Sequence, residues 1–367
     1  WIKVGEEMYL SQQLGEGRTG VRQELVTSAM EQCVEIGRRV TDFDAKRAAY
    51  RDQTGRYRRG IGMAVVMHGS SVANLDMAAA TLKMNDDGSF NLLMGATDLG
   101  TGSDTILAQI AAEVLNTDVD DIIVYSSDTD FTPFDKGAYA SSTAYLSGEA
   151  VRKTAVNIKN QLLEHAGKMM GVKDLNTLRL EYKKVVAADG RQVSFEEIGL
   201  SSLHQMAQHQ IMATESHVSP VSPPPTAAQF VEIVVDTETG KVDTERLVMV
   251  VDCGRVINPV TASGQVEGGM AQALGFALTE DMLYSAEGQP LNPNLKTYRV
   301  PRAVEMPVMD VIFVQTDEPT GPYGVKSVAE ISIDGVAPAM ASAIHSAIGV
   351  WLRDLPYTKE KVKKAFG

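Results

Sequence analysis

The sequence predicts an α+β fold built from two similar lobes, each combining a mixed sheet with helices. A β-hairpin, a glycine-rich loop and a helix follow one another between Ala78 and Leu115, and the same order recurs between Phe230 and Gly275. Both hairpins have short turns that contain glycine, and the first turn carries an Asp-Gly pair, which is a strong hairpin signal. We interpret the recurrence as an internal duplication of one α+β unit.

The composition is that of an ordinary globular protein. The 367 residues are 44% hydrophobic and 22% charged, which is enough chain for two or three domains. The 34 basic and 47 acidic residues give a net charge of −13, which argues against nucleic-acid binding and against docking on an anionic membrane. Cys33 and Cys253 lie far apart in no metal-binding spacing, so buried or reduced thiols and a cytoplasmic location are expected.

Residues 1–59 are expected to form an N-terminal helix and a linker. Val21–Arg39 has the periodicity of an amphipathic helix. The charged stretch Asp42–Arg59 is interpreted as a solvated face or a linker. The chain opens at Trp1 rather than Met, and Trp1–Arg18 resembles the middle of a domain, so we expect a fragment or a processed or split subunit.

The first lobe is expected at residues 60–218 and the second at 226–367. The proline-rich stretch Ser219–Pro225 between them is predicted to be an extended linker. In the first lobe we expect a buried strand, a hairpin and two helices, at 60–67, 78–84, 89–94, 106–115 and 151–166. In the second we expect a hairpin, a helix, a strand, a buried helix and a last helix capped by Thr358, at 230–236, 241–251, 264–275, 308–315, 336–348 and beyond 358.

The first candidate site is the stretch Gly321–Ser332. Its glycines and proline predict a tight turn, after which Glu330 stands between Ala329 and Ile331. A carboxylate among apolar residues is expected to be partly desolvated and therefore a stronger base. The alternative is a capping or salt-bridged Glu at a loop-to-helix junction, and this stretch alone favours that alternative.

The second candidate is the glycine-rich loop Gly95–Thr105. A loop with Gly100-Thr101-Gly102 that leads into a helix presents backbone N–H groups to an anion, usually a phosphate. A tight strand-to-helix connection explains the same glycines about equally well.

Two further stretches place small residues at the start of a helix. Small hydroxyl residues gather in Gly137–Val151, where they suit phosphate or carbonyl oxygens; N-capping by Ser147 or Thr143 explains one of them but not the run. In Gly264–Gly269 the glycines permit close helix packing or a close ligand, and Gln265 is expected either to bind a cofactor or to satisfy buried neighbours.

These stretches together carry a resemblance. Gly95–Thr105, Ala138–Val151, Asp252–Gly275 and Gly321–Glu330 occur in the order and at the separations typical of the molybdenum hydroxylase family, which includes xanthine dehydrogenase and aldehyde oxidoreductase. Over residues 20–365 the chain resembles the C-terminal half of the molybdopterin-binding subunit. The resemblance implies two lobes of the xanthine dehydrogenase type and a metal held by molybdopterin, either plain or as the cytosine dinucleotide, with no protein ligand to the metal.

The resemblance also implies roles for individual residues. Glu330 matches the general base of the family, whereas Thr101 stands where many members place a Gln near the metal. Many members have Gly before this Glu and Pro-Pro after it; here Ala329 precedes it and Ile331-Ser332 follow, which leaves the substrate open. The residues expected to bind the cofactor are Gly100, Thr101, Gly102, Ala138, Ala140, Ser141, Ser142, Thr143, Gln265 and Lys326.

The implied function is that of a catalytic subunit that hydroxylates an electron-poor carbon of an N-heterocycle, purine or nicotinate-like, with water as the oxygen source. The alternatives are an aldehyde oxidoreductase subunit, an aromatic thioester reductase subunit, and a non-catalytic half that holds the cofactor or assembles the complex. The expected partners are the other half of the molybdenum subunit and subunits that carry [2Fe–2S] clusters and FAD. His68 and Tyr139 are candidates for the substrate pocket, although such residues are more often packed or satisfied internally.

Overall fold

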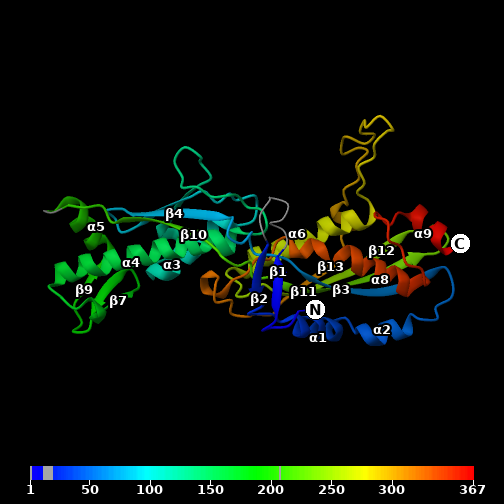
Figure 1. The fold of residues 1–367 in the computed structure, drawn as a ribbon, viewed down its shortest axis with the longest axis horizontal. Coiled ribbons are helices and arrows are strands. Elements are labelled where there is room, and N and C mark those ends of the chain that lie inside the picture. Colours follow the sequence, from blue (N-terminus) through cyan, green and yellow to red (C-terminus); the bar gives the residue numbers. More distant parts are fainter. Residues whose placement is uncertain (1, 11–19, 206–207) are drawn as a thin grey trace. The chain divides into compact units, whose positions relative to one another are not determined.

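The computed structural model describes residues 2–10, 20–205 and 208–367, so half of the opening stretch 1–18 lies outside the described residues (Figure 1). The chain divides into two compact units, and each unit is assembled from three separate segments. Unit 1 contains Trp1–Leu25, Gly69–Pro223 and Asp317–Ser327; unit 2 contains Val26–His68, Pro224–Thr316 and Val328–Gly367. The contiguous lobes expected from the sequence therefore differ from the units, although one crossing point, Pro223 to Pro224, lies inside the expected linker.

Unit 1 is organised around a four-stranded sheet with the order β10-β4-β5-β6. β4 and β5 form the predicted antiparallel hairpin, and β6 joins parallel to β5 after helix α3. Residues facing alternate sides of β4 and β5 alternate between buried and half-buried, as in a sheet covered on one face. The bounds are β4 Met77–Met84, β5 Phe90–Met94, α3 Ser103–Leu115, β6 Ile122–Ser126 and β10 Met212–Val218.

Smaller elements complete unit 1. The long helix α4 packs on β4, β10 and α3, and its buried positions include Ile158 and Leu162. A three-stranded sheet β7-β8-β9 and helix α5 follow it. The bounds are η2 Val119–Asp121, η3 Thr143–Ser147, α4 Gly148–Met170, η4 Leu175–Thr177, β7 Leu178–Glu181, β8 Lys184–Ala187, β9 Gln192–Ser194, α5 Phe195–His204 and η6 Pro322–Gly324.

The predicted helix Val21–Arg39 is partly wrong. Val21–Glu24 is strand β2, paired with β1 (Glu7–Leu10), and the helix α1 begins only at Met30 and ends at Val40. Burial alternates along β2, with Gln23 and Leu25 buried, and the Gln23 amide donates to the carbonyl of Ser222 at 2.8 Å. The first residues of the stretch predicted as a helix therefore form a strand, although their apolar spacing also fits a helix.

Unit 2 repeats the topology of unit 1. Its sheet has the order β13-β12-β11-β3; β11 and β12 form the predicted hairpin, and β13 joins parallel to β12 after helix α6. This repeat of hairpin, helix and parallel strand confirms the predicted duplication. The bounds are β3 Tyr57–Met67, β11 Thr226–Asp236, β12 Val242–Asp252, α6 Pro259–Leu278, η5 Ala303–Glu305 and β13 Val308–Phe313.

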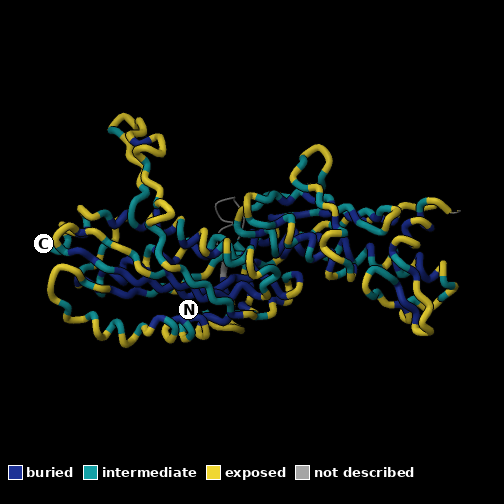
Figure 2. The backbone as a smooth tube through the Cα atoms, turned by 180° about the vertical axis from the view of Figure 1, so that it is seen from behind, coloured by how far each residue is buried: buried dark blue, intermediate teal, exposed yellow. Residues whose placement is uncertain are grey.

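The fourth strand of this sheet corrects the expected lobe boundary. Strand β3 was expected in the first lobe, yet it pairs antiparallel with β11 along its whole length, from Tyr57 opposite Asp236 to Met67 opposite Thr226. β11 is buried along nearly all of its length, so its backbone groups need a partner on each side (Figure 2). β3 meets that need from a segment that lies in the chain between the first and second segments of unit 1.

Helices cover both faces of the unit 2 sheet. α8 packs against β3 and β11, while α1 packs on the opposite face, where Phe230 and Val248 join Cys33 in a small core. Cys33 and Cys253 are both buried, as expected; the cytoplasmic location stays a prediction. The charged stretch Asp42–Arg59, expected to be a solvated face or a linker, contains helix α2, which has no buried residue. The bounds are α2 Phe43–Ala49, α7 Ile331–Asp334, α8 Val336–Ile348 and α9 Lys359–Phe366, which Thr358 caps as predicted.

The window Ile331–Ile348, which contains α7 and α8, is the one stretch of the described residues apolar and long enough to cross a membrane. Its mean hydropathy is 1.2, and 61% of it is buried inside the protein. We interpret it as the core helix of unit 2, in agreement with the buried helix predicted for 336–348.

Close packing of α6 against the segment before α8 depends on one glycine. A Cβ atom at Gly269 would lie 1.8 Å from the hydroxyl oxygen of Ser332, whereas a Cβ at the preceding Gly268 would meet nothing within 4 Å. Close packing, one of the two roles expected for these glycines, therefore applies to Gly269.

We predict that Gly269→Ala lowers the free energy of unfolding by about 1–3 kcal/mol, because overpacking displaces Ser332. Gly268→Ala is the matched control on the same helix; it should be neutral or raise stability by up to about 1 kcal/mol, since alanine restricts the unfolded chain more than glycine does. Urea unfolding of both variants checks this. Equal midpoints for the two variants would contradict the packing argument.

Candidate functional site

Glu330 stands at the point where the chain enters α7. Its neighbour Ile331 is fully buried in the core of unit 2, but the Glu330 side chain is 43% exposed. The carboxylate is therefore half-buried, in keeping with the partial desolvation expected from its apolar neighbours, while its strength as a base stays a prediction. Successive residues entering a helix point in directions about 100° apart, so the buried neighbour does not bury the carboxylate fully.

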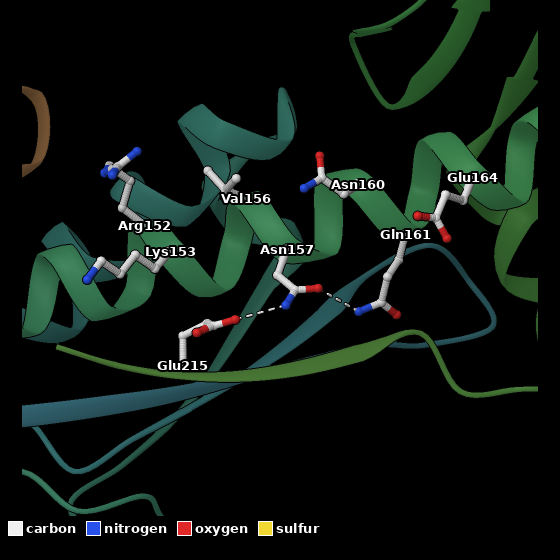
Figure 3. Close-up of a pocket in the computed structure, with 8 residues that line it drawn as sticks. All are labelled: Arg152, Lys153, Val156, Asn157, Asn160, Gln161, Glu164 and Glu215. Atoms are coloured by element: carbon white, nitrogen blue, oxygen red, sulfur yellow. Dashed lines mark hydrogen bonds between the residues drawn. The ribbon is translucent and has the colours of Figure 1, made fainter. Parts of the chain in front are cut away.

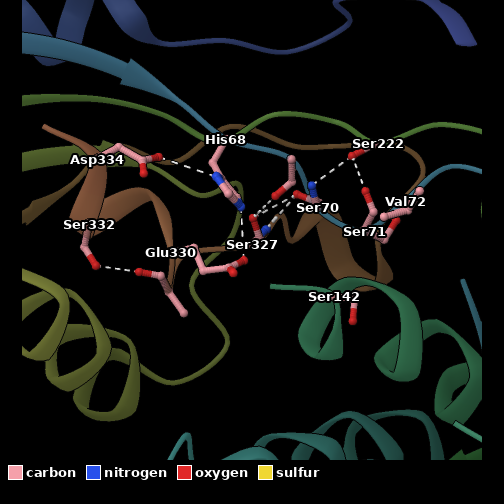
Figure 4. A network of polar contacts seen from close by, with 12 residues as sticks. His68, Ser70, Ser71, Val72, Ser142, Ser222, Ser327, Glu330, Ser332 and Asp334 are labelled. Atoms are coloured by element: carbon pink, nitrogen blue, oxygen red, sulfur yellow. Dashed lines mark hydrogen bonds and ion pairs between the residues drawn. The ribbon is translucent and has the colours of Figure 1, made fainter. Parts of the chain in front are cut away.

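The carboxylate of Glu330 is paired with His68, the residue that follows strand β3 (Figure 4). The Nε2 atom of His68 lies 3.0 Å from Oε2 of Glu330, and its Nδ1 atom lies 3.4 Å from Oδ2 of Asp334. The imidazole therefore stands between two carboxylates that come from the same short segment of unit 2. The salt-bridged alternative considered for Glu330 describes this arrangement.

The charge of His68 follows from these contacts. Interactions with Asp334 and then Glu330 outweigh partial burial and raise the pKa of His68 from 6.5 to about 9. At neutral pH the ring is an imidazolium, with an N–H on each nitrogen and a carboxylate facing each N–H. The cluster of His68, Glu330 and Asp334 thus carries one positive and two negative charges.

Contacts from strand β11 and helix α6 hold the backbone that follows Glu330. The buried amide of Gln229, on β11, donates to the carbonyl of Ser332 at 2.7 Å. Gly335 leaves room for this amide, because a Cβ there would lie 2.0 Å from Oε1 of Gln229. Together with the close approach of Gly269 to Ser332, these contacts hold α7 against the sheet and helix α6.

In unit 1, a cluster of buried serines fixes the segments that continue from His68 and lead to Glu330. The N–H of Ser327 donates to the hydroxyl of Ser70 at 2.9 Å, and the Ser70 hydroxyl donates to the carbonyl of Pro223 at 2.6 Å. The N–H of Ser70 donates to the hydroxyl of Ser222 at 3.0 Å (Figure 4). Both ends of the segment Gly69–Pro223 and the end of the segment Asp317–Ser327 are thereby tied together within unit 1.

The glycine-rich loop in unit 1 is closed by its own aspartate. The carboxylate of Asp98 accepts from the N–H groups of Gly100 at 2.9 Å, Gly102 at 3.1 Å and Asp104 at 3.3 Å. Although partial burial acts in the opposite direction, these donors hold the pKa of Asp98 below its ordinary value. Asp98 therefore uses three of the N–H groups that were expected to bind an anion, as in a tight strand-to-helix connection. The Thr101 hydroxyl, 3.5 Å from Asp98, stays a cofactor candidate.

The predicted hydroxyl run has an unusual backbone. Ala140 and Ser141 both adopt left-handed conformations, with φ of 49° and 50°, and Thr143–Ser147 form a π-helical turn before α4. Consecutive left-handed non-glycine residues and π-turns are costly and occur preferentially at functional sites. The hydroxyl of Ser142 donates to the carbonyl of Gly137 at 3.1 Å, and the hydroxyl of Ser147 donates to Asp135 at 2.7 Å instead of capping the helix.

The predicted site residues fall into two groups, one in each unit. Lys326, only 1% exposed, lies in unit 1, whereas Gln265, half-buried on α6, and Glu330 lie in unit 2. The other predicted cofactor residues lie in unit 1; they are Gly100, Thr101, Gly102, Ala138, Ala140, Ser141, Ser142 and Thr143. Their assignment to the cofactor stays a prediction.

The donor chemistry of these residues suits an organic cofactor. Within 2–10, 20–205 and 208–367, no group of three or more His, Cys, Asp or Glu side chains could hold a metal ion. Directly after the glycine-rich loop, the hydroxyl of Ser103 and Oδ1 of Asp104 are buried without a hydrogen-bond partner in the described part of the chain. Such orphaned polar atoms beside a hydroxyl-rich run fit a polar group that occupies this part of unit 1.

A groove of about 460 Å³ along α4 contains none of the predicted site residues (Figure 3). Asn157 donates to Glu215 at 2.9 Å, and Gln161 donates to Asn157 at 3.0 Å, so these three polar side chains are linked to one another. These contacts attach α4 to β10, and we interpret the groove as structural.

Comparison with known proteins tests the family resemblance that the sequence carries. Residues 37–307 match the family described as Molybdopterin cofactor-binding domain. The chain belongs to this family. The finding confirms the resemblance to the molybdenum hydroxylases, and it makes the hydroxyl-rich and glycine-rich stretches parts of a molybdopterin cofactor-binding chain.

Two curated relatives from Escherichia coli match nearly the whole chain. One is "Probable hypoxanthine oxidase XdhD" of strain K12, 35% identical over 99% of this chain and 38% of the relative. The other is "Xanthine dehydrogenase molybdenum-binding subunit" of O157:H7, 34% identical over 95% of this chain and 47% of the relative. The chain thus spans less than half the length of each.

A solved structure confirms the fold class. Reconstituted CO dehydrogenase from Oligotropha carboxidovorans superposes with a TM-score of 0.86, at 23% identity, over 97% of this chain and 47% of that chain. At this level of identity the likeness concerns the fold alone. The α+β architecture with two duplicated mixed lobes, as predicted, is therefore shared with this CO dehydrogenase.

Some residues around Glu330 were missed from the sequence. Asp334 follows Glu330 by four positions, a spacing that puts both on one face of a helix, but the helix was not predicted to begin before Val336. Gln229 gave no local signal, because it lies within an apolar strand. Tyr139, a pocket candidate, donates its hydroxyl to the buried carboxylate of Asp76 and is satisfied internally.

We predict that Asp98→Ala lowers the free energy of unfolding by about 0.5–2 kcal/mol, because three backbone N–H groups lose their acceptor. Since the folded-state pKa of Asp98 lies below 3.8, this stabilisation is present above about pH 4 and is lost as the pH falls through the folded value. Unfolding midpoints of both proteins, measured at several pH values, test this. Asp130→Ala, at an exposed loop position, is the control; a difference from wild type that does not shrink in acid would argue against the assigned role.

Proposed function

We propose that this chain is the catalytic molybdopterin-binding part of a multi-subunit molybdenum hydroxylase that acts on a purine-like N-heterocycle. The observation that carries the proposal is the carboxylate of Glu330, which is partly exposed yet held in position by His68 and by the anchored turn of α7. A non-catalytic scaffold needs no exposed carboxylate fixed in this way. Family membership gives this carboxylate its proposed role as the general base.

The residues of unit 1 are suited to hold the cofactor. The hydroxyls of Thr101 and Thr143, the left-handed turn at Ala140-Ser141 and the buried hydroxyl of Ser103 offer polar contacts to a pterin and its phosphate. We infer molybdopterin, plain or as the cytosine dinucleotide, as the ligand. When bound, this group supplies the redox chemistry and the metal at which the substrate carbon is oxidised.

The contribution of Glu330 is proton transfer. Its carboxylate accepts a proton from the water-derived nucleophile, which must become more electron-rich before it attacks an electron-poor carbon. With 43% of the side chain exposed in this chain, the proton can afterwards pass directly to solvent. The remaining task of the chain is positioning, because a well-placed base and a fixed substrate lower the barrier together.

The complete enzyme requires further parts. Because the chain spans 38% and 47% of the two relatives, we propose that the other half of the molybdenum subunit completes the cofactor site. We also propose partner subunits with [2Fe–2S] clusters and FAD, because the electrons taken from the substrate need an acceptor chain.

The names of the two relatives support a purine substrate over the alternatives. One is named as a hypoxanthine oxidase and the other as a xanthine dehydrogenase subunit. A panel containing hypoxanthine, xanthine, nicotinate, an aromatic aldehyde and an aromatic thioester tests this with the purified complex. Turnover of the aldehyde or thioester without turnover of either purine would overturn the substrate class but not the family.

We predict that Glu330→Gln lowers kcat by about 10²–10⁴-fold while the molybdenum content of the complex stays at the wild-type value, because glutamine cannot accept the proton. Metal analysis and steady-state kinetics on the same preparation check this. Glu35→Gln, at an exposed position of α1, is the control and should leave both values unchanged. Full turnover in Glu330→Gln would refute the catalytic proposal and favour the assembly alternative.

A further inference from the structure

Both ring nitrogens of His68 face a carboxylate oxygen. Nε2 lies 3.0 Å from Glu330 and Nδ1 lies 3.4 Å from Asp334. A neutral imidazole has only one N–H and would turn a lone pair toward one of the two carboxylates, which is unfavourable. As long as both carboxylates are ionised, the geometry therefore favours the imidazolium form.

We propose that His68, held by Asp334, is a positioning residue that aims the Glu330 carboxylate and keeps it in its charged, proton-accepting form. This inference rests on the proposed function, because it takes Glu330 as the base. His68 itself touches neither cofactor nor substrate in the proposal. It acts through Glu330, by one charge-assisted hydrogen bond and one positive charge.

Asp334 holds His68, and His68 holds Glu330; we call this arrangement the clamp. It is attached to the sheet of unit 2. His68 follows β3 directly, and the last residue of β3, Met67, is still in register with Thr226 of β11. The His68 side chain is 29% exposed, so it is more enclosed than the carboxylate that it holds. Since the strand end is paired within the sheet, an imidazolium attached to it restricts the directions that the Glu330 side chain can take.

Asp334 explains how the positive charge is kept in place. It comes four residues after Glu330, one helical turn further on, so the two carboxylates lie on the same face of α7. Within the described part of the chain, the charged groups that act on the His68 ring are these two carboxylates, and both favour its protonated form. Asp334 therefore fixes the ring from the side away from Glu330 and leaves Nε2 for the base.

The clamp is distinct from a proton relay. In a relay the imidazole accepts a proton from its neighbour, but a ring that already carries both protons can only donate. Glu330 must therefore return its proton to water, which its exposed carboxylate can reach. Loss of the His68 charge should shift the pH range in which Glu330 is a carboxylate, without removing the route of the proton.

The first test measures the His68 ring itself in the intact complex. The exchange of the imidazole C2–H with deuterium follows the protonation state of each histidine and is read peptide by peptide by mass spectrometry. We expect a midpoint near pH 9 for His68 in the wild type, because the interactions with Asp334 and Glu330 raise its pKa to about 9. In Asp334→Asn and in Glu330→Gln the midpoint should fall toward 6.5. His204, paired with Asp86 in unit 1, serves as the internal control and should not respond to either substitution.

A His68 midpoint near 6.5 in the wild type, or one that neither substitution moves, would overturn the clamp. This measurement does not depend on turnover. It therefore remains informative if a variant at position 68 fails to assemble.

The second test compares His68→Gln and His68→Lys by the pH profile of kcat/KM. Glutamine keeps a hydrogen-bond donor but removes the charge, so the acidic limb should move to higher pH, and below that limb the rate should fall about ten-fold for each pH unit of movement. Lysine restores a positive charge and should return the limb toward its wild-type position. KM should change little, because His68 does not contact the substrate.

The outcomes separate the clamp from the proposed function. Turnover retained in Glu330→Gln rejects Glu330 as the base, and the clamp is rejected with it. No turnover in Glu330→Gln, together with a wild-type pH profile in His68→Gln, rejects the clamp alone. A shifted limb in His68→Gln that His68→Lys reverses supports both.

Discussion

The antiparallel pairing of β3 with β11 is the interaction on which the candidate site depends. It holds β3 in one register along its whole length and thereby places His68 at a fixed point beside the sheet. The same strand carries Gly60 and Gly62, whose missing side chains let α8 approach: a Cβ at Gly62 would lie 2.0 Å from the carbonyl oxygen of Ala339. One strand therefore both carries His68 and seats the helix that continues from the Glu330 segment. A slip of one residue would turn His68 to the other face of the sheet and separate it from Glu330.

Local signals made most of the elements predictable, whereas pairing between distant segments was not. The Asp-Gly turn and the apolar runs around it identified the β4–β5 hairpin, because a hairpin is encoded within about fifteen residues. Nothing in 60–67 indicates that its partner is 226–236, since any buried strand reads alike. The helix predicted over Val21–Arg39 was partly wrong for the same reason. Its apolar spacing fits a helix, but its first four residues pair with β1 as strand β2. The duplication was visible because the order of elements, unlike their partners, is written along the chain.

The site shows a similar limit at the level of single side chains. The sequence identified Glu330 through its neighbours, and family membership supports that choice, but the direction of a side chain depends on where a helix begins. Ile331 enters the core, so Glu330 points outward and meets His68. In the glycine-rich loop the sequence predicted N–H donors without predicting that Asp98 would accept from them. A free donor and a donor used by a neighbouring carboxylate have the same sequence; only the fold distinguishes them.

The departure of this chain from the common family pattern after the base has a structural meaning. Glu330 adopts helical angles, φ −70° and ψ −30°, and Ile333 donates its N–H to the carbonyl of Glu330 at 3.0 Å. A proline after the glutamate, as in many family members, disfavours those helical angles at the preceding residue. The Ile331-Ser332 pair therefore permits α7 to begin at the base itself, and only then does Asp334 fall one helical turn away, within reach of His68. Where proline would fix the backbone by its ring, this chain fixes it by a buried isoleucine and by the hydrogen bond from Gln229 to the Ser332 carbonyl. The replacement of the prolines and the carboxylate pair around His68 are thus two parts of one arrangement.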